Sequence, residues 1–253
     1  MEIIKHNQDQ WELKVKQKNQ WTVPVSSEEI QKARMGDWSI IVTSTKPVPK
    51  EWFPELNGKN VLCLASGGGQ QGPVLAAAGA NVTVLDFSES QLEQDRFVAE
   101  RDGLSIRTVL GSMTDLSMFE SESFDLLVHP VSNLYVPDIQ PVWQEAYRVL
   151  KPGGIMISGF MNPVFYLFDW ELEEQGTLRV KHTLPYSELD YATEEEIVRS
   201  GVALEFGHTL EQQMGGQIQS GFMIAGLYED SFGGEKLLDR YANSLIATRA
   251  IKL

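Results

Sequence analysis

The chain has 253 residues, with 21 Lys or Arg and 35 Asp or Glu, so its formal net charge at pH 7 is −14. This length can bury a large core without disulfides, and the negative charge disfavours binding to a nucleic-acid backbone. The single cysteine, Cys63, excludes an intramolecular disulfide and a three-cysteine iron–sulfur cluster. No apolar run reaches the roughly 18 residues of a membrane span, and the first residues contain no signal-peptide core. We therefore expect a cytoplasmic protein without nucleic-acid or membrane partners.

The front of the chain predicts a helical cap. Ser26 and Glu29 have capping-box spacing and predict a short helix that ends near Gly36. Prolines at positions 47, 49 and 54 exclude a long helix after Ser39. The basic stretch KVKQK at 14–18 predicts a solvated helix face. We expect residues 1–55 to form an N-terminal cap segment and residues 56–253 to form the main domain.

The main domain alternates strands with helices. Strands are predicted over residues 60–64, 81–86, 106–110, 124–129 and 155–160, and helices over 72–79, 89–103 and 138–150. Residues 151–154, KPGG, are predicted to stop the third helix before the fifth strand. Two last strands, 222–228 and 244–252, are joined by too few residues for a crossover helix, which indicates an antiparallel return. The predicted fold is a Rossmann-like three-layer α/β sandwich whose mostly parallel seven-stranded sheet ends in an antiparallel hairpin.

The alternation stops after Phe160. Residues 162–191 are aromatic and acidic without a clear period, and Thr193 with Glu196 predicts the start of a short helix. Thr209 with Gln212 predicts the start of the last core helix, which ends near Gly221. We expect residues 161–207 to form an insertion or lid, with the acidic stretches ELEE and TEEE as solvated surface.

A glycine-rich stretch, ASGGGQQG at 65–72, directly follows the first strand of the main domain. Gly67, Gly69 and Gly72 match the spacing G-x-G-x-x-G. A strand that ends in glycines lets backbone N–H groups approach a ligand, so the stretch indicates a nucleotide or cofactor loop. The alternative is a tight turn between strand and helix.

Four blocks in order carry a family resemblance: VLCLASGGGQQG, VTVLDFSESQL, GSMTDL with FDLLVHPVSNLYVPD, and RVLKPGG before IMISGF. Over about residues 58–160 the chain resembles class I S-adenosylmethionine-dependent methyltransferases of the ubiquinone-biosynthesis-type small-molecule group. The resemblance implies S-adenosyl-L-methionine as methyl donor, S-adenosyl-L-homocysteine as product, and in-line transfer to a small-molecule acceptor. An NAD(P)-dependent oxidoreductase stays an alternative, because the glycine spacing and Asp86 permit it, and a non-enzymatic S-adenosylmethionine-binding relative is a second. The acceptor and the oligomeric state stay open.

The resemblance also implies a set of cofactor-binding residues: Ala65, Ser66, Gly67, Gly69, Asp86, Phe87, Gln91, Ser112, Met113, His129 and Pro130. Asp86 ends a strand, where a carboxylate can accept both ribose hydroxyl protons, or it is a helix N-terminal acid. Met113 flanks the adenine or belongs to the core. We expect the variant Gly67→Val to stay folded but to lose cofactor binding, because the valine side chain would fill the space that the methionine moiety needs.

Three positions depart from the family pattern. The family usually has an acid where Cys63 stands and a glycine where Ala65 stands, and often an aspartate at the position of Ser112. The changes remove carboxylates that serve the methionine amino group and the adenine amine. Cys63, inside a predicted buried strand, is expected to be a small core side chain rather than a nucleophile.

The candidates for catalysis or acceptor contact are His129, Asn133, Tyr135, Asn162 and Tyr166. His129 ends the fourth strand and either adjoins the methionine part of the cofactor or only bonds to backbone, whereas Asn133 and Tyr135 follow it in the loop. Asn162 and Tyr166 belong to MNPVFYLFDW, which forms core, lid or acceptor pocket. No Asp-Asp-Asn set falls at the strand ends, so no catalytic metal is predicted.

Overall fold

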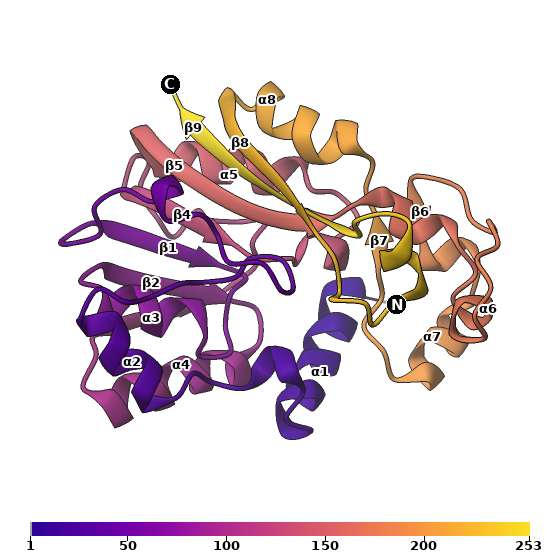
Figure 1. Cartoon of the computed structure of the whole chain (residues 1–253), viewed down its shortest axis with the longest axis horizontal. Coiled ribbons are helices and arrows are strands. Elements are labelled where there is room, and N and C mark those ends of the chain that lie inside the picture. The colour runs from indigo at the N-terminus through magenta and orange to yellow at the C-terminus, as the bar shows by residue number, and fades with distance from the viewer. Residues whose placement is uncertain (1) are drawn as a thin grey trace.

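A seven-stranded sheet forms the centre of the computed structural model, which describes residues 2–253. The strand order is β3-β2-β1-β4-β5-β9-β8 (Figure 1). The first five strands run parallel, and β9 pairs antiparallel with both β5 and β8. The predicted sheet with its antiparallel end is confirmed. The strands are β1 (Asn60–Leu64), β2 (Asn81–Asp86), β3 (Ile106–Leu110), β4 (Phe124–His129), β5 (Leu150–Met161), β8 (Phe222–Asp230) and β9 (Leu245–Lys252).

Helices cover both faces of the sheet (Figure 1). One face carries α2 (Ser27–Arg34), α3 (Gln71–Ala77) and α4 (Glu89–Asp102), and the other carries α5 (Gln140–Val149) and α8 (Gly216–Gln219). Along β1, side chains alternate between these two layers because successive residues of a strand point to opposite faces. The three-layer sandwich is thus confirmed.

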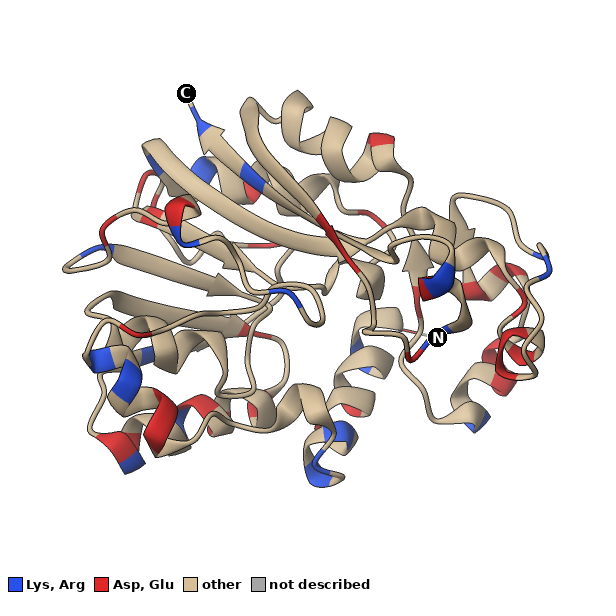
Figure 2. Cartoon of the chain, in the orientation of Figure 1, with Lys and Arg blue, Asp and Glu red and all other residues tan. Residues whose placement is uncertain are grey.

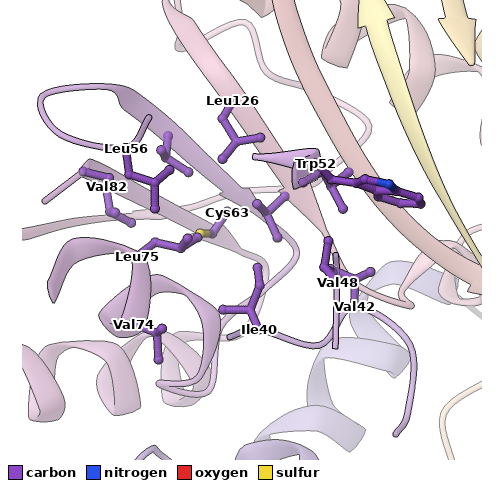
Figure 3. Packing of buried hydrophobic residues seen from close by; sticks show 14 of the residues in the cluster. Ile40, Val42, Val48, Trp52, Leu56, Cys63, Val74, Leu75, Val82 and Leu126 are labelled. Atoms are coloured by element: carbon purple, nitrogen blue, oxygen red, sulfur yellow. The ribbon is translucent and has the colours of Figure 1, made fainter. Parts of the chain in front are cut away.

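The core shows this alternation directly. Cys63 packs with Leu75 of α3 (Figure 3), whereas Leu62 and Leu64 pack with Trp143 of α5. Cys63 is 0% exposed, and burial raises the pKa of its thiol, which keeps the thiol protonated. The expectation of a buried core side chain at Cys63 is confirmed.

The helix starts follow the sequence signals, but one boundary differs. Ser26, Ser88 and Thr193 accept hydrogen bonds from the backbone N–H groups of the first helical turns. The prediction that KPGG separates helix and strand is wrong, because β5 begins at Leu150 and includes residues 151–154. A register shift in the pairing of β4 with β5 accommodates the early start. The turn capped by Thr209 begins as a π-helix, Glu211–Gly215, and continues into α8.

The first helix, α1 (Ile3–Lys16), lies between α4 and α7 (Glu194–Ser200) in Figure 1. The Gln8 side-chain amide donates to the Phe87 carbonyl, and the Glu12 carboxylate accepts from the Ser88 hydroxyl at 2.8 Å. Asn7 is fully buried and bonds to the backbone of residues 135 and 204. These contacts fix α1 beside the C-terminal end of β2. Lys14 is half-buried, so the prediction of a wholly solvated KVKQK face is wrong at this residue.

Residues 39–47, called the strap below, run across the C-terminal ends of β4 and β5. The Val42 carbonyl accepts from the backbone N–H of Val131 at 3.1 Å. The Asp230 carboxylate at the end of β8 accepts from the hydroxyls of Thr43 and Thr45, each at 2.7 Å, and from backbone N–H groups of 44–46. Burial raises the pKa of Asp230, but these hydrogen bonds outweigh burial and hold the pKa well below its usual range. The strap is therefore anchored by an ionised carboxylate.

The segment after β5 contains α6 (Trp170–Glu174), α7 and a two-stranded sheet of β6 (Tyr186–Ser187) and β7 (Phe206–Gly207). Its core is aromatic, with Tyr166 stacked on Tyr186 at a centroid distance of 5.1 Å. The acidic residues of ELEE lie on α6 (Figure 2), but Glu173 is buried and accepts from the backbone N–H of Leu238. The prediction of a solvated ELEE surface is therefore wrong at Glu173. The lid role of residues 161–207 stays a prediction.

We expect Gly159→Ala to loosen the strap. A Cβ atom at Gly159 would lie 1.9 Å from the Val42 carbonyl oxygen, so β5 and the strap would have to separate. The free energy of unfolding should fall by about 1–3 kcal/mol, and amide hydrogen exchange of residues 39–47 should accelerate. Gly215→Ala is the control, because a Cβ atom there meets nothing closer than 3.5 Å. Unchanged stability and exchange in Gly159→Ala would show that the close contact does not hold the strap.

Candidate active site

A cavity of about 880 Å³ opens at the C-terminal ends of the parallel strands. This volume lies within the roughly 300–1,000 Å³ of small-molecule sites. The strand order reverses direction at β1, between β2 and β4, which is where ligands bind in open α/β sheets. Four parts of the chain line the cavity: the front segment, the strap, the glycine loop and the segments that follow β4 and β5.

The glycine loop turns sharply at the end of β1. Gly68 and Gly69 have positive φ values of 114° and 72°, which glycine adopts without strain, whereas Ala65 has a φ of 47°, which is unfavourable for a residue with a Cβ atom. A Cβ atom at Gly67 would lie 2.7 Å from the Gln91 Cβ and 3.1 Å from an Asp86 carboxylate oxygen. The missing side chain therefore faces α4 rather than ligand space. The expected reason for the effect of Gly67→Val is wrong, because valine would collide with the protein itself.

Asp86 ends β2 and lines the cavity at only 5% exposure. One carboxylate oxygen accepts from the Gly67 backbone N–H at 2.9 Å, and the other accepts from Ser88 at 2.9 Å. Burial raises the pKa of Asp86 to about 6, although these hydrogen bonds oppose the shift. Because a carboxylate has about four acceptor sites, Asp86 retains capacity to accept from a ligand hydroxyl.

A second carboxylate, Asp95 of α4, lies below the loop and was not predicted. It is 0% exposed, and its Oδ2 accepts from the Gly68 backbone N–H at 3.1 Å, whereas Oδ1 has no partner among residues 2–253. Burial raises the pKa of Asp95 to about 8. The carboxyl group of Asp95 interacts electrostatically with the buried thiol of Cys63, so α4 supplies an acidic group close to the position where the family usually has one.

The cavity brings together only part of the predicted site. Its lining includes the predicted residues Ala65, Ser66, Gly67, Asp86, Phe87, Gln91, Pro130 and Tyr135. Other predicted residues are not part of that lining: Gly69, Ser112, Met113, His129, Asn133, Asn162 and Tyr166. The functional roles of both groups stay predictions.

His129 is fully buried at the end of β4. Its Nδ1 lies 2.9 Å from the Leu64 carbonyl oxygen, and its Nε2 lies 2.8 Å from the Asn133 side-chain oxygen. Asn133 in turn donates to the side chain of Gln213 at 2.8 Å. Burial lowers the pKa of His129, and its hydrogen bonds oppose that shift. Both ring nitrogens are therefore used inside the protein, one by backbone and the other by a side chain, and a role of His129 beside the cofactor stays a prediction.

Four other predicted residues also make internal contacts. Asn162 accepts from the backbone N–H of Val164 and begins a 3₁₀ turn, Pro163–Leu167. Tyr166 is 0% exposed, and its hydroxyl donates to Glu205 Oε2 at 3.2 Å. Met113 belongs to a core cluster, and the Ser112 hydroxyl lies 2.8 Å from that of Thr114.

Several cavity residues were missed by the sequence analysis: Trp11, Lys14, Thr43, Glu205 and Phe232. They come from segments far apart in the chain, and no motif or spacing connects them. Among residues 2–253, no three His, Cys, Asp or Glu side chains form a group that could hold a metal ion. Over the same residues, each helix is too short or too polar to cross a membrane.

The mostly parallel sheet, its antiparallel end and a cavity above a glycine loop with a strand-end carboxylate define the class I methyltransferase fold. A family model described as a methyltransferase domain matches residues 62–158. The protein described as "uncharacterized methyltransferase YbaJ" of Bacillus subtilis (strain 168) is 56% identical over 254 residues, which cover 99% of each chain. The chain belongs to the class I S-adenosylmethionine-dependent methyltransferase family.

Other similarities cover less of the chain or are more distant. A ubiquinone biosynthesis O-methyltransferase of Pseudomonas syringae pv. tomato is 32% identical over 127 residues, which cover 48% of this chain and 55% of that protein. A crystal structure of an S-adenosylmethionine-dependent methyltransferase from Mesorhizobium loti has a TM-score of 0.62 at 18% identity and covers 80% of this chain and 95% of its own. At this identity the structural similarity shows the fold alone.

Family membership identifies the protein as an S-adenosylmethionine-dependent methyltransferase and disfavours the nicotinamide oxidoreductase alternative. The residues present fit this methyl donor. The cavity reaches the glycine loop, and the Asp86 carboxylate retains acceptor capacity for a ribose hydroxyl. No pyrophosphate needs to be bound, which agrees with a loop whose first amides already donate to Asp86 and Asp95.

We expect the affinity for S-adenosylhomocysteine to fall as the pH decreases through about 6. The carboxylate form of Asp86 accepts hydroxyl protons, and protonation near its pKa of about 6 removes acceptor sites. Asp86→Asn should bind about 10-fold or more weakly at pH 8, because hydrogen bonds to a charged group contribute roughly 1.5–3 kcal/mol each. Isothermal titration from pH 5 to 8 measures both effects.

The exposed Asp37 provides the control variant Asp37→Asn for the loss of one negative charge. It should keep the affinity and the pH dependence of the wild type. Two results together would exclude a role of Asp86 in binding the ribose. The affinity of the wild type would stay constant down to pH 5, and Asp86→Asn would bind S-adenosylhomocysteine normally.

Proposed function

We propose that this methyltransferase acts on a small molecule that binds in the half of the cavity remote from the glycine loop. One observation carries the proposal: a single cavity is lined both by the loop with Asp86 and by a cluster of aromatic residues, Trp11, Tyr135, Phe165 and Phe232. Aromatic side chains supply large apolar contact area, as small-molecule sites require. A methyl donor and an acceptor can therefore occupy adjacent regions of the same cavity.

The residues divide into two sets in this proposal. Asp86 binds the ribose, Phe87 and Gln91 border the adenine, and the backbone of 65–67 contacts the methionine part. When bound, S-adenosylmethionine supplies a methyl group on a positively charged sulfur. The aromatic residues orient the acceptor, while α1 and the strap exclude water. Such positioning is the main requirement of an in-line displacement.

Residues 1–55 act as a cap over the cavity in this proposal. Trp11, Lys14 and Trp21 of this segment line the cavity together with strap residues such as Thr43. The hydrogen bonds of Asn7 to the backbone of Tyr135 and Leu204 hold α1 against both the loop after β4 and the segment before β7. The cap therefore connects the regions assigned to donor and acceptor.

A test uses a small-molecule extract of Bacillus subtilis cells that lack YbaJ, in which the acceptor of that relative should accumulate. S-adenosylmethionine with a labelled methyl group is added to the wild-type chain with and without the extract. We expect labelled product and S-adenosylhomocysteine only when chain and extract are both present. Mass spectrometry of the small-molecule fraction measures the product.

The outcomes separate the alternatives. Binding of S-adenosylhomocysteine without turnover in any extract would support a non-enzymatic cofactor-binding relative. Label that appears only after the macromolecular fraction is added would contradict a small-molecule acceptor. An Asp86→Asn sample should form product more slowly at limiting donor concentration, which excludes a contaminating enzyme as the source of label.

We further expect Asn7→Ala to loosen the cap. Removal of its side chain leaves the buried N–H of Leu204 unpaired, at a cost of about 1–3 kcal/mol. Amide hydrogen exchange in α1 should accelerate, and the rate of methylation of the acceptor in the extract should fall. The exposed Gln17→Ala is the control. A variant with fast exchange in α1 but normal turnover would show that the cap is not needed for catalysis.

A further inference from the structure

Glu205 supplies a carboxylate to the proposed acceptor half of the cavity. No sequence motif predicts this residue as part of a site. It directly precedes β7, is half-buried and lines the cavity. Its Oε2 accepts from the Tyr166 hydroxyl at 3.2 Å, whereas Oε1 has no hydrogen-bond partner within residues 2–253. The backbone N–H of Glu205 donates to the Glu188 carboxylate, which fixes the main chain. One carboxylate oxygen is thus held by the protein, and the other remains available to a ligand.

The surroundings of Glu205 favour a ring-shaped ligand. Trp11 and Tyr135 form an edge-to-face pair with centroids 5.4 Å apart, and Phe165 lies 5.7 Å from Phe232. All four line the same cavity as Glu205. Such aromatic surfaces bind planar molecules through stacked and edge-to-face contacts.

Side chains of both charges line the cavity, with Glu29, Asp86, Glu205 and Glu235 against the single basic residue Lys14 of this lining. Lys14 lines the cavity, with its Nζ 4.3 Å from the centroid of Trp11 and 5.7 Å from that of Tyr135. It forms no ion pair with Glu205 among the described residues. The Lys14 ammonium opposes a cationic acceptor, and the carboxylates of Glu205 and Glu235 oppose an anionic one. A neutral molecule with a hydroxyl group fits both constraints.

We propose that Glu205 Oε1 accepts the proton that a ring-borne hydroxyl loses on methylation, so that the acceptor is a phenol- or enol-like molecule. The inference rests on the proposed function. The hydroxyl oxygen forms a bond to the methyl carbon as the bond from that carbon to sulfur breaks. The hydroxyl proton passes to Glu205, so a neutral alcohol, a sulfonium and a carboxylate become a neutral ether, a thioether and a carboxylic acid. Tyr166 acts through Glu205 as a positioning residue.

The titration of Glu205 agrees with this role. Burial raises the pKa of Glu205 to about 7, while the Tyr166 hydrogen bond and Lys14 oppose the shift. The ionisable groups coupled to it from the surrounding elements are Lys14, Tyr135, Tyr166, Tyr186, Glu188 and Lys236. The proton-accepting form is the carboxylate, so the rate should rise with pH through about 7. A base whose pKa lies near the working pH is effective in general base catalysis.

The test compares Glu205→Gln with the wild type, using the extract of YbaJ-deficient cells as acceptor and labelled S-adenosylmethionine as donor. At limiting extract, the rate should fall about 100-fold and lose its rise near pH 7. Affinity for S-adenosylhomocysteine, measured by titration calorimetry, should stay within about threefold of the wild type. Glu120→Gln, at an exposed residue outside the cavity, is the matched control for one lost charge.

Two further readouts do not depend on the rate of Glu205→Gln. The difference between carboxyl ¹³C NMR spectra of wild type and Glu205→Gln, both with S-adenosylhomocysteine, should show one carboxyl that titrates near pH 7. Tyr166→Phe should shift the rising limb of the rate to higher pH, because the Tyr166 hydrogen bond holds the pKa of Glu205 down and its loss raises that pKa. The labelled product should be a neutral methyl ether by mass spectrometry.

A product that keeps its proton count, such as a quaternary ammonium or a sulfonium, would overturn the inference. So would a normal rate or an unchanged pH profile in Glu205→Gln. In both cases the proposed function would stand, because labelled small-molecule product had formed. Absence of labelled product from the wild type would instead refute the proposed function, and this inference with it.

Discussion

The site depends on two buried carboxyl groups that accept hydrogen bonds from backbone N–H groups of the glycine loop. Asp86 accepts from Gly67, and Asp95 accepts from Gly68. These bonds hold the loop against α4, where side chains at Gly67 and Gly69 would collide with Gln91 and with the backbone of Gln94. Because the loop is drawn to this side, the opposite side of its backbone borders the cavity between β1 and β4.

The cavity is enclosed by segments that lie far from the loop in sequence. The strap is fixed at one end by the ionised carboxylate of Asp230 and crosses β5 where Gly159 provides space for the Val42 carbonyl. Helix α1 is fixed by Asn7, Gln8 and Glu12. The same sheet that carries the glycine loop therefore supports the walls of the cavity.

The sequence was sufficient for elements whose signals are local. The bounds of β1 to β4 agree with the predicted ranges, because apolar strands bounded by glycine, proline and capping residues are readable one segment at a time. The sequence was insufficient for predicting contacts between residues that only the complete fold brings together. Nothing near Glu205 or Lys14 in the chain indicates that both side chains line one cavity. His129 and Tyr166 were predicted for the site, but neither lines the cavity, and their hydrogen bonds to Leu64, Asn133 and Glu205 arise only from tertiary packing.

A crystal structure of the chain with S-adenosylhomocysteine tests the central claim that the loop, α1 and the strap form one methyl-transfer cavity. We expect the ribose hydroxyls to lie within hydrogen-bond distance of Asp86, and the thioether sulfur to face the region bordered by Tyr135 and Glu205. A ligand bound outside this cavity, or a ribose remote from Asp86 with its sulfur directed away from Tyr135 and Glu205, would contradict the claim.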